Sequence, residues 1–343
     1  MNNIQKLIRP NITALAPYSC ARDEFKGEAS VYLDANESPY NNGTNRYPDP
    51  LQSEVKSLLA PLKKVRPEQI FLGNGSDEAI DLVYRIFCRP GIDNVVAPAP
   101  TYGMYQVCAD INDIEYRAVP LKADYQLDME AMKQAIDENT KAIWLCSPNN
   151  PTGNVFAKED LLWFLDNAEA MIVVDEAYID FSDKGTMVEM LDKYPNLIVL
   201  QTFSKAWGQA AIRLGIAMAS EEVISLYNKV KYPYNVNILT QQQALKVLGN
   251  VSKKESQVKE ILAQRDVLKN LLLSLTCVEE IYPSDSNFLL VKVNDANGIY
   301  KYLQDKGIIV RNRHRVTLCA NCLRITVGTP TENAEIYNAL KDF

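Results

Sequence analysis

The chain contains very little histidine: His314 is the one histidine among 343 residues. A hydrolase built on a Ser-His-Asp or Cys-His arrangement would depend on this residue. His314 lies between Arg313 and Arg315 in a charged segment, a setting typical of an exposed loop. We therefore expect proton transfer to depend on another side chain.

Long apolar runs and an excess of positive charge are also missing. No segment approaches the ~18 apolar residues of a membrane span, and the amino-terminal MNNIQKLIRPNI has no apolar core after its charged residues. The net charge of -7 argues against general affinity for nucleic acid or anionic membranes. We expect a soluble, cytoplasmic protein that binds neither nucleic acid nor membranes.

The cysteines do not form a disulfide framework. There are seven, an odd number, and they are spread over a long chain, which suits a reducing compartment. Cys319 and Cys322 form a CxxC pair. Because the chain offers no second pair and one histidine, we expect no metal site.

The length and the sequence pattern predict an α/β fold with two domains, since 343 residues exceed what one core usually supports. Residues 1–30 are irregular and are expected to form an amino-terminal arm. In residues 31–232 short apolar strands alternate with helical segments, which indicates a large domain with a mainly parallel sheet wrapped by helices. Residues 233–343 are expected to form a smaller C-terminal α/β domain from strand-like SNFLLVKV, GIIVRN and CLRITVG and a final helix near Glu332 to Leu340.

Three motifs carry most of the chemistry: SPNNPTG at 147–153, VVDEAY at 173–178 and TFSKAWGQAAIRLG at 202–215. Each follows or ends an apolar, β-branched run, so each is expected to leave the end of a buried strand. Ligands of open α/β sheets bind at the carboxyl ends of the strands. Asn150, Asp175 and Lys205 are therefore expected to contact one ligand.

A phosphorylated pyridine aldehyde fits this set of side chains. The amine of Lys205 can form a Schiff base with the aldehyde, and the carboxylate of Asp175 can keep the pyridine nitrogen protonated. Asn150 and Tyr178 are expected to hydrogen-bond the ring oxygen. The phosphate is expected to bind Ser204 and Arg213 and the start of a helix at Ser76 and Asp77, where free backbone N–H groups favour anions.

With these motifs the chain resembles the aspartate aminotransferase superfamily of pyridoxal 5'-phosphate (PLP) enzymes, fold type I. The segments LDANESPY, NRYPDP, PTYGMY and CLRITVGT further resemble the histidinol-phosphate aminotransferases over almost the entire length. The resemblance implies that Tyr102 stacks on the cofactor ring and that Thr202 joins the phosphate ligands. It also implies a homodimer in which Tyr47 reaches the cofactor phosphate of the neighbouring subunit.

The strand-like segment CLRITVG contains a residue that we expect to contact the substrate. Leu323, Ile325 and Val327 share one face, so Arg324 lies on the other, either as a surface residue or as a ligand for an anion. The resemblance implies that Arg324 binds the phosphate of histidinol phosphate and, in the other half-reaction, the carboxylate of glutamate or 2-oxoglutarate. It further implies that Arg311 assists with the phosphate and that Tyr18 and Asn36 contact substrate.

The implied reaction is a ping-pong transamination in histidine biosynthesis, with Lys205, Asp175 and Tyr178 as catalytic residues. Two positions depart from the family pattern: Trp207 stands where Phe is more common, and Ala211 stands where Gly is more common. A methyl group at 211 would disturb the loop if that position required a positive φ. The alternatives are a lyase resembling threonine-phosphate decarboxylase, an aromatic amino-acid aminotransferase and a PLP-binding regulator without catalysis.

Overall fold

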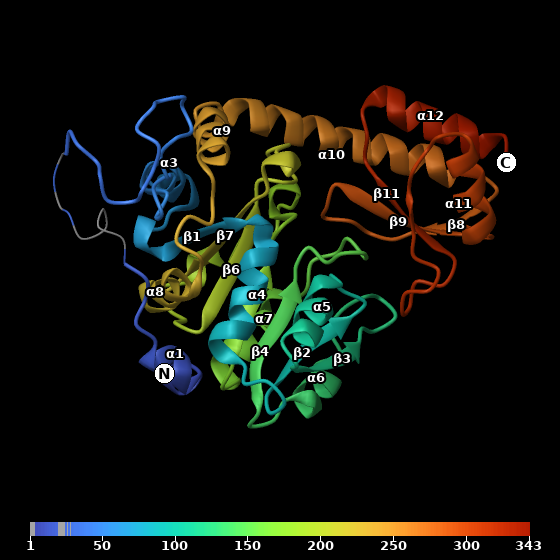
Figure 1. Cartoon of the computed structure of the whole chain (residues 1–343). Coiled ribbons are helices and arrows are strands. Elements are labelled where there is room, and N and C mark those ends of the chain that lie inside the picture. Colours follow the sequence, from blue (N-terminus) through green and yellow to red (C-terminus); the bar gives the residue numbers. More distant parts are fainter. Residues whose placement is uncertain (1–3, 20–24, 26, 28) are drawn as a thin grey trace.

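Two sheets joined by a long helix, α10 (Val251–Leu273), dominate the fold in the computed structural model (Figure 1). The structure describes residues 4–19, 25, 27 and 29–343. In this part of the chain no helix combines the length and apolar character needed to cross a membrane. The expected α/β class is confirmed.

The large sheet has seven strands in the order β1-β7-β6-β5-β4-β2-β3, and β7 alone runs antiparallel to its neighbours. Its strands are β1 (Ile70–Asn74), β2 (Asn94–Ala99), β3 (Glu115–Pro120), β4 (Thr140–Cys146), β5 (Met171–Asp175), β6 (Leu197–Thr202) and β7 (Leu214–Ala219). The central strands are apolar at almost every position because helices cover both faces. The expectation of a mainly parallel sheet wrapped by helices is confirmed.

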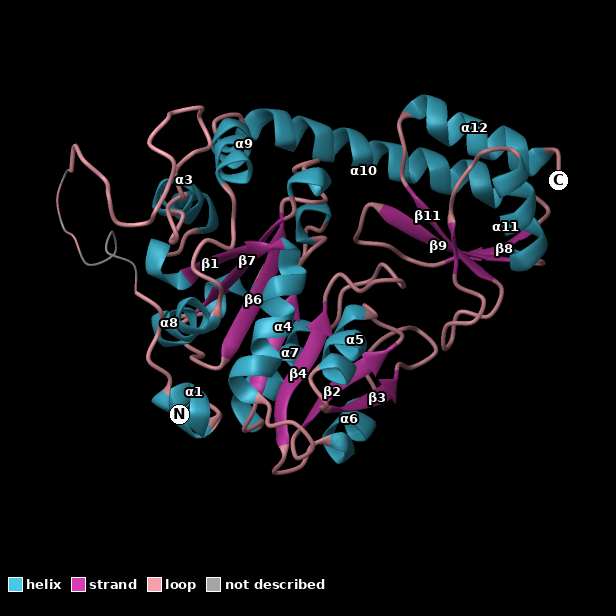
Figure 2. Ribbon diagram, viewed as in Figure 1, coloured by secondary structure: helices cyan, strands magenta, loops and turns pink. Residues whose placement is uncertain are grey.

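Side chains of one strand enter different cores on the two faces of the sheet. Helices lie on both sides of the large sheet (Figure 2). In β4, Trp144 packs in the core formed with α4, α5 and α8, whereas Ile143 and Leu145 pack in the core formed with α3, α6, α7 and α9. The helices of this part are α1 (Pro10–Ala14), α3 (Ser53–Lys63), α4 (Gly75–Phe87), α5 (Met104–Ile111), α6 (Met129–Ala135), α7 (Lys158–Asn167), α8 (Glu221–Val230) and α9 (Ile238–Leu248).

The small sheet is antiparallel, in the order β10-β11-β9-β8, and packs against the second half of α10. Its elements are β8 (Val278–Ile281), β9 (Phe288–Val293), α11 (Ala296–Asp305), β10 (Arg311–Asn312), β11 (Cys322–Thr326) and α12 (Pro330–Lys341). The strand expected from GIIVRN is limited to two residues. Leu323, Ile325 and Val327 share the apolar face of this sheet, as expected.

The domain boundary expected after residue 232 stays a prediction. Helix α9 follows this position, and its residues Ala244 and Leu248 belong to the core that also contains Val55 and Leu59 of α3. The first long helix of the small part is therefore α10, which leads away from the large sheet toward the small one (Figure 1). The expected amino-terminal arm lies partly outside the described residues.

The parallel strands β4, β5 and β6 are adjacent, so the loops that follow them meet at one edge of the sheet. Helix α4 begins at the same edge, where Gly75 donates its backbone N–H to the carbonyl oxygen of Arg213 at 2.8 Å. This close approach requires glycine in β7: a Cβ atom on Gly215 would lie 2.1 Å from the backbone of Gly75 and Ser76.

Gly215→Ala is therefore expected to destabilise the protein by about 1–3 kcal/mol or more, because the added methyl group forces the start of α4 away from β7. Urea unfolding measures this change as a lower midpoint. Gly103→Ala is the matched control, since a Cβ there meets no atom within 4 Å. Equal midpoints for the two variants would show that the contact at Gly215 is looser than described.

Candidate active site

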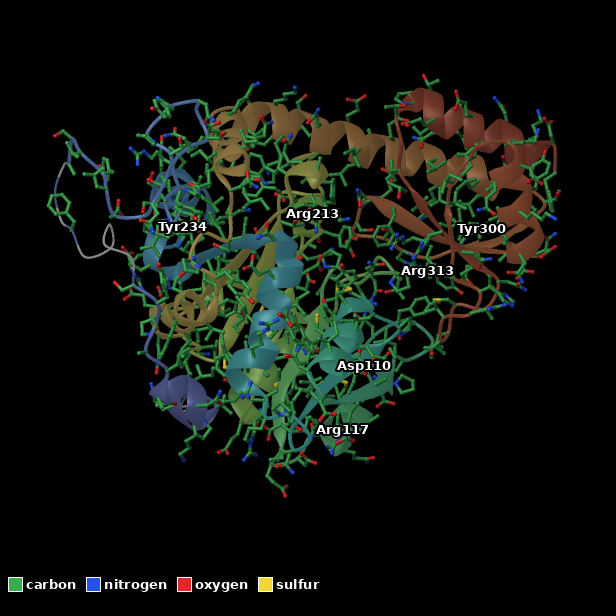
Figure 3. The ribbon with its side chains drawn as sticks, viewed as in Figure 1. Asp110, Arg117, Arg213, Tyr234, Tyr300 and Arg313 are labelled. Carbon is green, nitrogen blue, oxygen red and sulfur yellow. The ribbon has the colours of Figure 1, made fainter. Side chains whose placement is uncertain are left out.

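A cavity of about 140 Å³ lies at the carboxyl ends of β4, β5 and β6. Figure 3 labels Arg213 near this edge of the large sheet, and Arg313 on the small part, where it faces the large one. The cavity is lined by every residue of the chain's own predicted cofactor set: Ser76, Asp77, Tyr102, Asn150, Asp175, Tyr178, Thr202, Ser204, Lys205 and Arg213. Their placement together supports the prediction of one shared ligand, while their individual roles stay predictions.

Asp175 is the last residue of β5 and is almost fully buried. One carboxylate oxygen accepts a hydrogen bond from the hydroxyl of Tyr105 at 2.7 Å, and the other accepts one from the backbone N–H of Ala177 at 3.0 Å. Burial raises the pKa of Asp175, because the charged form loses its hydration. A buried carboxylate in this state favours a cationic N–H partner, which a protonated pyridine nitrogen provides.

Lys205 follows β6 and projects toward Tyr178, with its ammonium nitrogen 5.5 Å from the centre of the tyrosine ring. Burial lowers the pKa of Lys205, and the positive charge of Arg324 lowers it further. A larger share of this lysine is therefore the neutral amine than at a solvated position. The neutral amine is the form that attacks an aldehyde, so the site suits covalent attachment of the predicted cofactor.

The start of α4 and the loop after β6 form the end of the cavity predicted to hold a phosphate. The N–H of Gly75, the first residue of α4, is taken by the carbonyl oxygen of Arg213. The cap residue Asn74 makes no side-chain hydrogen bond to the helix start, so the N–H groups of Ser76 and Asp77 remain available for an anion. Arg213 lies beside them, and its guanidinium is 3.3 Å from a carboxylate oxygen of Asp77. A dianion at this place would bind backbone donors and a cation together.

Tyr102 lines the cavity and is half-buried, as a ring that stacks on a cofactor requires. Its hydroxyl donates a hydrogen bond to Asp77 at 3.0 Å, and its ring meets the ring of Tyr105 edge to face. Burial raises its pKa, and the charge of Asp77 adds to this effect. The tyrosine therefore stays a neutral donor, held beside the predicted phosphate end.

Arg324 extends from β11 of the small sheet to Asn150, a residue of the cavity lining. Its guanidinium donates a hydrogen bond to the side-chain oxygen of Asn150 and lies 5.2 Å from the centre of the Phe288 ring. Its Nε atom is buried and has no acceptor among the described residues. Burial lowers the pKa of Arg324. A guanidinium with an unused buried donor is suited to bind an anionic ligand.

Arg311 and the predicted residues of the amino-terminal segment lie outside this cavity. Arg311 pairs with Arg324 across β10 and β11, but it is exposed. Tyr18 is 72% exposed. Asn36 and Tyr47 line a different cavity, and Tyr47 stacks on Tyr234 with ring centres 4.4 Å apart. The predicted contacts of these residues with substrate or with a neighbouring subunit stay predictions.

Some residues at the site were missed in the sequence. Tyr105 belongs to the motif PTYGMY, but nothing in that motif indicates that the second tyrosine bonds Asp175, 70 residues away. Cys146 lines the cavity at the end of β4 and is fully buried. Burial raises the pKa of its thiol well above the usual value, so it is neutral there. In the sequence both residues stand in or beside a motif, and many other residues do so too. Their position in the sequence therefore could not single them out.

The lysine loop tolerates Ala211 because the positive φ angles fall elsewhere. Gly208 has a φ of 63° and Arg213 a φ of 53°, whereas Ala211 lies within a short 3-10 helix (Ala210–Ile212) and is not among the residues with positive φ. The methyl group of Ala211 therefore introduces no backbone strain. Position 211 therefore does not require the positive φ angle that would have disfavoured alanine there.

Trp207 gives the lysine loop a contact with α10. The indole is buried against Phe203, with ring centres 5.3 Å apart. The ammonium of Lys254, in the first turns of α10, lies 5.3 Å from the indole and forms an ion pair with Asp180 at 2.9 Å. The loop that carries Lys205 is thus held to the helix that leads to the small sheet.

The expectation for His314 was wrong in one respect. The residue is half-buried, and its Nδ1 atom accepts a hydrogen bond from the backbone N–H of Asn321 at 3.1 Å. Its imidazole closes the loop between β10 and β11, which the sequence could not show because the partner is a backbone group. It does not line the cavity with Lys205.

Comparisons with known proteins agree with this geometry. The family model described as aminotransferase class I and II matches residues 26–340. A protein of Bacteroides thetaiotaomicron named histidinol-phosphate aminotransferase is 58% identical over 344 residues, covering 100% of this chain and 99% of the relative. One of Parabacteroides distasonis with the same name is 54% identical over 342 residues, covering 100% and 99%.

Solved structures share the fold at lower identity. The histidinol-phosphate aminotransferase of Clostridium acetobutylicum has a TM-score of 0.80 at 22% identity and covers 87% of this chain and 90% of its own. That of Sinorhizobium meliloti, solved with pyridoxal-5'-phosphate, has a TM-score of 0.79 at 24% identity and covers 87% and 82%. The likeness of the whole chain to these proteins supports one conclusion: this chain belongs to the class I and II aminotransferases.

Proposed function

We propose that this chain is a PLP-dependent enzyme that transfers an amino group between L-histidinol phosphate and 2-oxoglutarate, in histidine biosynthesis. The products are imidazole-acetol phosphate and glutamate. The observation that carries this proposal is one cavity lined by Lys205 and Asp175, a reactive amine and a buried acid. The guanidinium of Arg324 donates a hydrogen bond to Asn150 of the same lining. Named relatives that are 50–58% identical over almost the full chain support the same activity.

The bound cofactor supplies an aldehyde carbon that accepts an amine and a pyridine ring that accepts electrons. Lys205 would hold the cofactor through its amine. Because its pKa is lowered, the free amine could act as a base that takes the proton from the donor carbon and delivers it to the carbon that was the aldehyde carbon. The nearby ring of Tyr178 limits where the ammonium can lie.

Asp175 would hold the ring nitrogen of the cofactor in its protonated form. The hydrogen bonds that Tyr105 and the backbone of Ala177 donate to its two oxygens favour the charged carboxylate and oppose the effect of burial. These donors orient the carboxylate before the cofactor arrives, so little reorganisation accompanies the reaction. Tyr178 and Asn150 are positioned to donate to the ring oxygen from the loops after β5 and β4. Each of these roles is a proposal from placement in the cavity.

Arg324 is proposed to bind the anion of both substrates in turn. Its planar fork matches two oxygens of a carboxylate or of a phosphate. One residue can therefore serve glutamate in one half-reaction and histidinol phosphate in the other. Its hydrogen bond to Asn150, 174 residues earlier in the chain, supports this role because Asn150 lines the cavity with Lys205 and Asp175.

We further propose a homodimer in which Tyr47 completes the cofactor site of the neighbouring subunit. Tyr47 lies away from the cavity of its own chain, which is compatible with a role in a second copy. Large apolar side chains close in sequence to Tyr47 and its ring partner Tyr234 are exposed, among them Leu33, Tyr40 and Tyr232. A second subunit would cover them, and would bring Tyr18 and Asn36 toward a substrate. A cytoplasmic location stays a prediction.

A panel of amino donors tests the proposed activity. Histidinol phosphate, threonine phosphate and phenylalanine are each supplied with 2-oxoglutarate, and both glutamate and carbon dioxide are measured. We expect glutamate from histidinol phosphate, with Lys205→Ala as the inactive control because it lacks the amine. Carbon dioxide from threonine phosphate would instead identify a lyase, and a preference for phenylalanine would identify an aromatic aminotransferase.

Arg324→Ala is expected to lower kcat/KM for both histidinol phosphate and glutamate, roughly 10- to 100-fold each, because a charged hydrogen bond is lost in both half-reactions. Steady-state kinetics with each donor measure the effect. Lys292→Ala is a matched control: this cation also lies on the small sheet, but it pairs with Glu279. A loss with one donor alone would contradict recognition of both anions by Arg324.

The pH dependence of cofactor uptake should also change with Arg324. Burial and this positive charge lower the pKa of Lys205, so its neutral amine forms at a lower pH than that of a solvated lysine. Arg324→Gln removes the charge and should move PLP uptake by the apoprotein, followed by absorbance, to higher pH. Arg324→Lys keeps the charge and should stay near the wild-type profile. A shift to lower pH in Arg324→Gln would contradict the coupling.

A further inference from the structure

Glu176 follows Asp175 at the end of β5, but its side chain lies in a different environment. It is 2% exposed and borders another cavity, of about 240 Å³. Its carboxylate accepts hydrogen bonds from the hydroxyl of Thr186 at 2.5 Å, the backbone N–H of Met187 at 2.6 Å and Nε2 of Gln201 at 2.9 Å. Three donors around two oxygens suit the charged carboxylate, because a carboxylic acid also needs an acceptor for its proton.

Glu176 connects the active-site turn to the rest of the large domain. Its backbone N–H donates to the carbonyl oxygen of Leu200 in β6 at 2.8 Å. Asp175 and Tyr178 belong to the same turn and line the active-site cavity. The carboxylate in turn holds the loop that precedes Met187. Glu176 therefore joins the turn that carries two predicted cofactor ligands both to β6 and to this loop.

The loop from Ser182 to Thr186 has open space on two sides. One side borders the cavity of about 240 Å³, and the other borders a cavity of about 300 Å³. The middle residues of the loop, 183–185, are exposed. Packing therefore restrains this loop little, and its hydrogen bonds to Glu176 fix the end that continues into the next helical turn.

The side chain of Gln201 has an unused acceptor next to this carboxylate. Gln201 is 5% exposed, and its Oε1 atom is buried and has no partner among the described residues. If Glu176 takes up a proton from solvent, its new hydroxyl needs an acceptor. Rotation of the Gln201 amide would present Oε1 to this hydroxyl and would withdraw Nε2. The pair therefore has two arrangements, which differ by one proton and one amide rotation.

The charges around Glu176 come from three further elements. Burial raises the pKa of Glu176 to about 7, whereas its hydrogen-bond donors and the charge of Lys63 in α3 act in the opposite direction. Asp180 and Lys254, from the 3-10 helix at 179–181 and from α10, form an ion pair at 2.9 Å and act on Lys63. Both forms of Glu176 are therefore populated close to neutral pH.

We propose that Glu176 is a positioning residue of the active site: its carboxylate form holds the turn that carries Asp175 and Tyr178, and protonation loosens this turn. Glu176 acts through the backbone and through its three donors, without contact with cofactor or substrate. The inference rests on the proposed function, because it assumes that Asp175 and Tyr178 contact the cofactor. It assigns a further residue to the motif that contains Asp175.

Binding of PLP to the apoprotein at pH 6 to 8, followed by absorbance, tests this assignment. Glu176→Gln has the size of the protonated form and lacks the charge. We expect it to weaken PLP binding about 10-fold at pH 8, as for the loss of a hydrogen bond to a charged group. The ratio of the two dissociation constants should fall toward 1 at pH 6, because wild-type Glu176 is then mostly protonated. A ratio that stays constant, or that equals 1 at pH 8, would overturn the proposal.

The ratio removes the titration of groups that both proteins share, such as Asp175 and the cofactor itself. Glu189→Gln is the matched control, since Glu189 is an exposed acid in the 3-10 helix that follows Thr186. It should bind PLP as wild type does at each pH. Urea unfolding identifies any variant that has lost its fold.

Gln201→Met supplies a second, independent measurement if Glu176→Gln does not fold. It removes one donor from the carboxylate, so Glu176 should keep its proton to a higher pH. The pH below which PLP binding weakens should therefore move upward relative to wild type. An unchanged profile, or a shift to lower pH, would contradict the role of Glu176.

The two proposals fail in different ways, because PLP binding does not depend on which amino donor is used. If wild type does not convert histidinol phosphate but the ratio for Glu176→Gln changes with pH as expected, the proposed substrate is wrong and Glu176 remains a positioning residue. If wild type converts histidinol phosphate and the ratio stays constant, the function stands and the role of Glu176 is wrong.

Discussion

The parallel pairing of β4, β5 and β6 is the constraint on which the active site depends. It aligns the ends of three strands, so Asn150, Asp175 and Lys205 leave the sheet at one edge. The strands can hold this register because their side chains are apolar on both faces and enter two separate cores. The strands below the site therefore carry apolar side chains, which do not compete for the hydrogen bonds of the polar residues at the strand ends.

The charged groups around the cavity favour one orientation of a bound ligand. Asp175 provides a buried negative charge at the end of the strands, and Lys205 an amine with a lowered pKa. The start of α4 with Arg213 is predicted to bind one anion, and Arg324 is proposed to bind another. A molecule with a cationic ring nitrogen and two separated anionic groups satisfies all of these positions. This arrangement fits the proposed cofactor and substrate, each of which carries an anion.

The fold and the cofactor side of the site could be predicted from local sequence because their signals are local. Alternation placed Leu323 and Ile325 on one face of β11 and Arg324 on the other, and the apolar spacing of α4 placed Ile80 and Val83 in the core. The sequence did not indicate that Tyr105 donates to Asp175, or that His314 accepts from a backbone N–H. The side chains in such contacts can adopt several rotamers of similar energy, and the tertiary packing determines which rotamer is occupied.

The sequence by itself determined which chemical groups are available: a lysine, an acid and an amide after three buried strands, a helix start for a phosphate, and arginines on a strand of a second sheet. Strand and helix periodicity decide these features over a few residues. Only the tertiary structure decided that Arg324 reaches Asn150, that Arg311 pairs with Arg324 and that Lys254 holds Trp207 to α10. These relations depend on how the two sheets pack across α10, and distances between segments far apart in the chain follow from that packing.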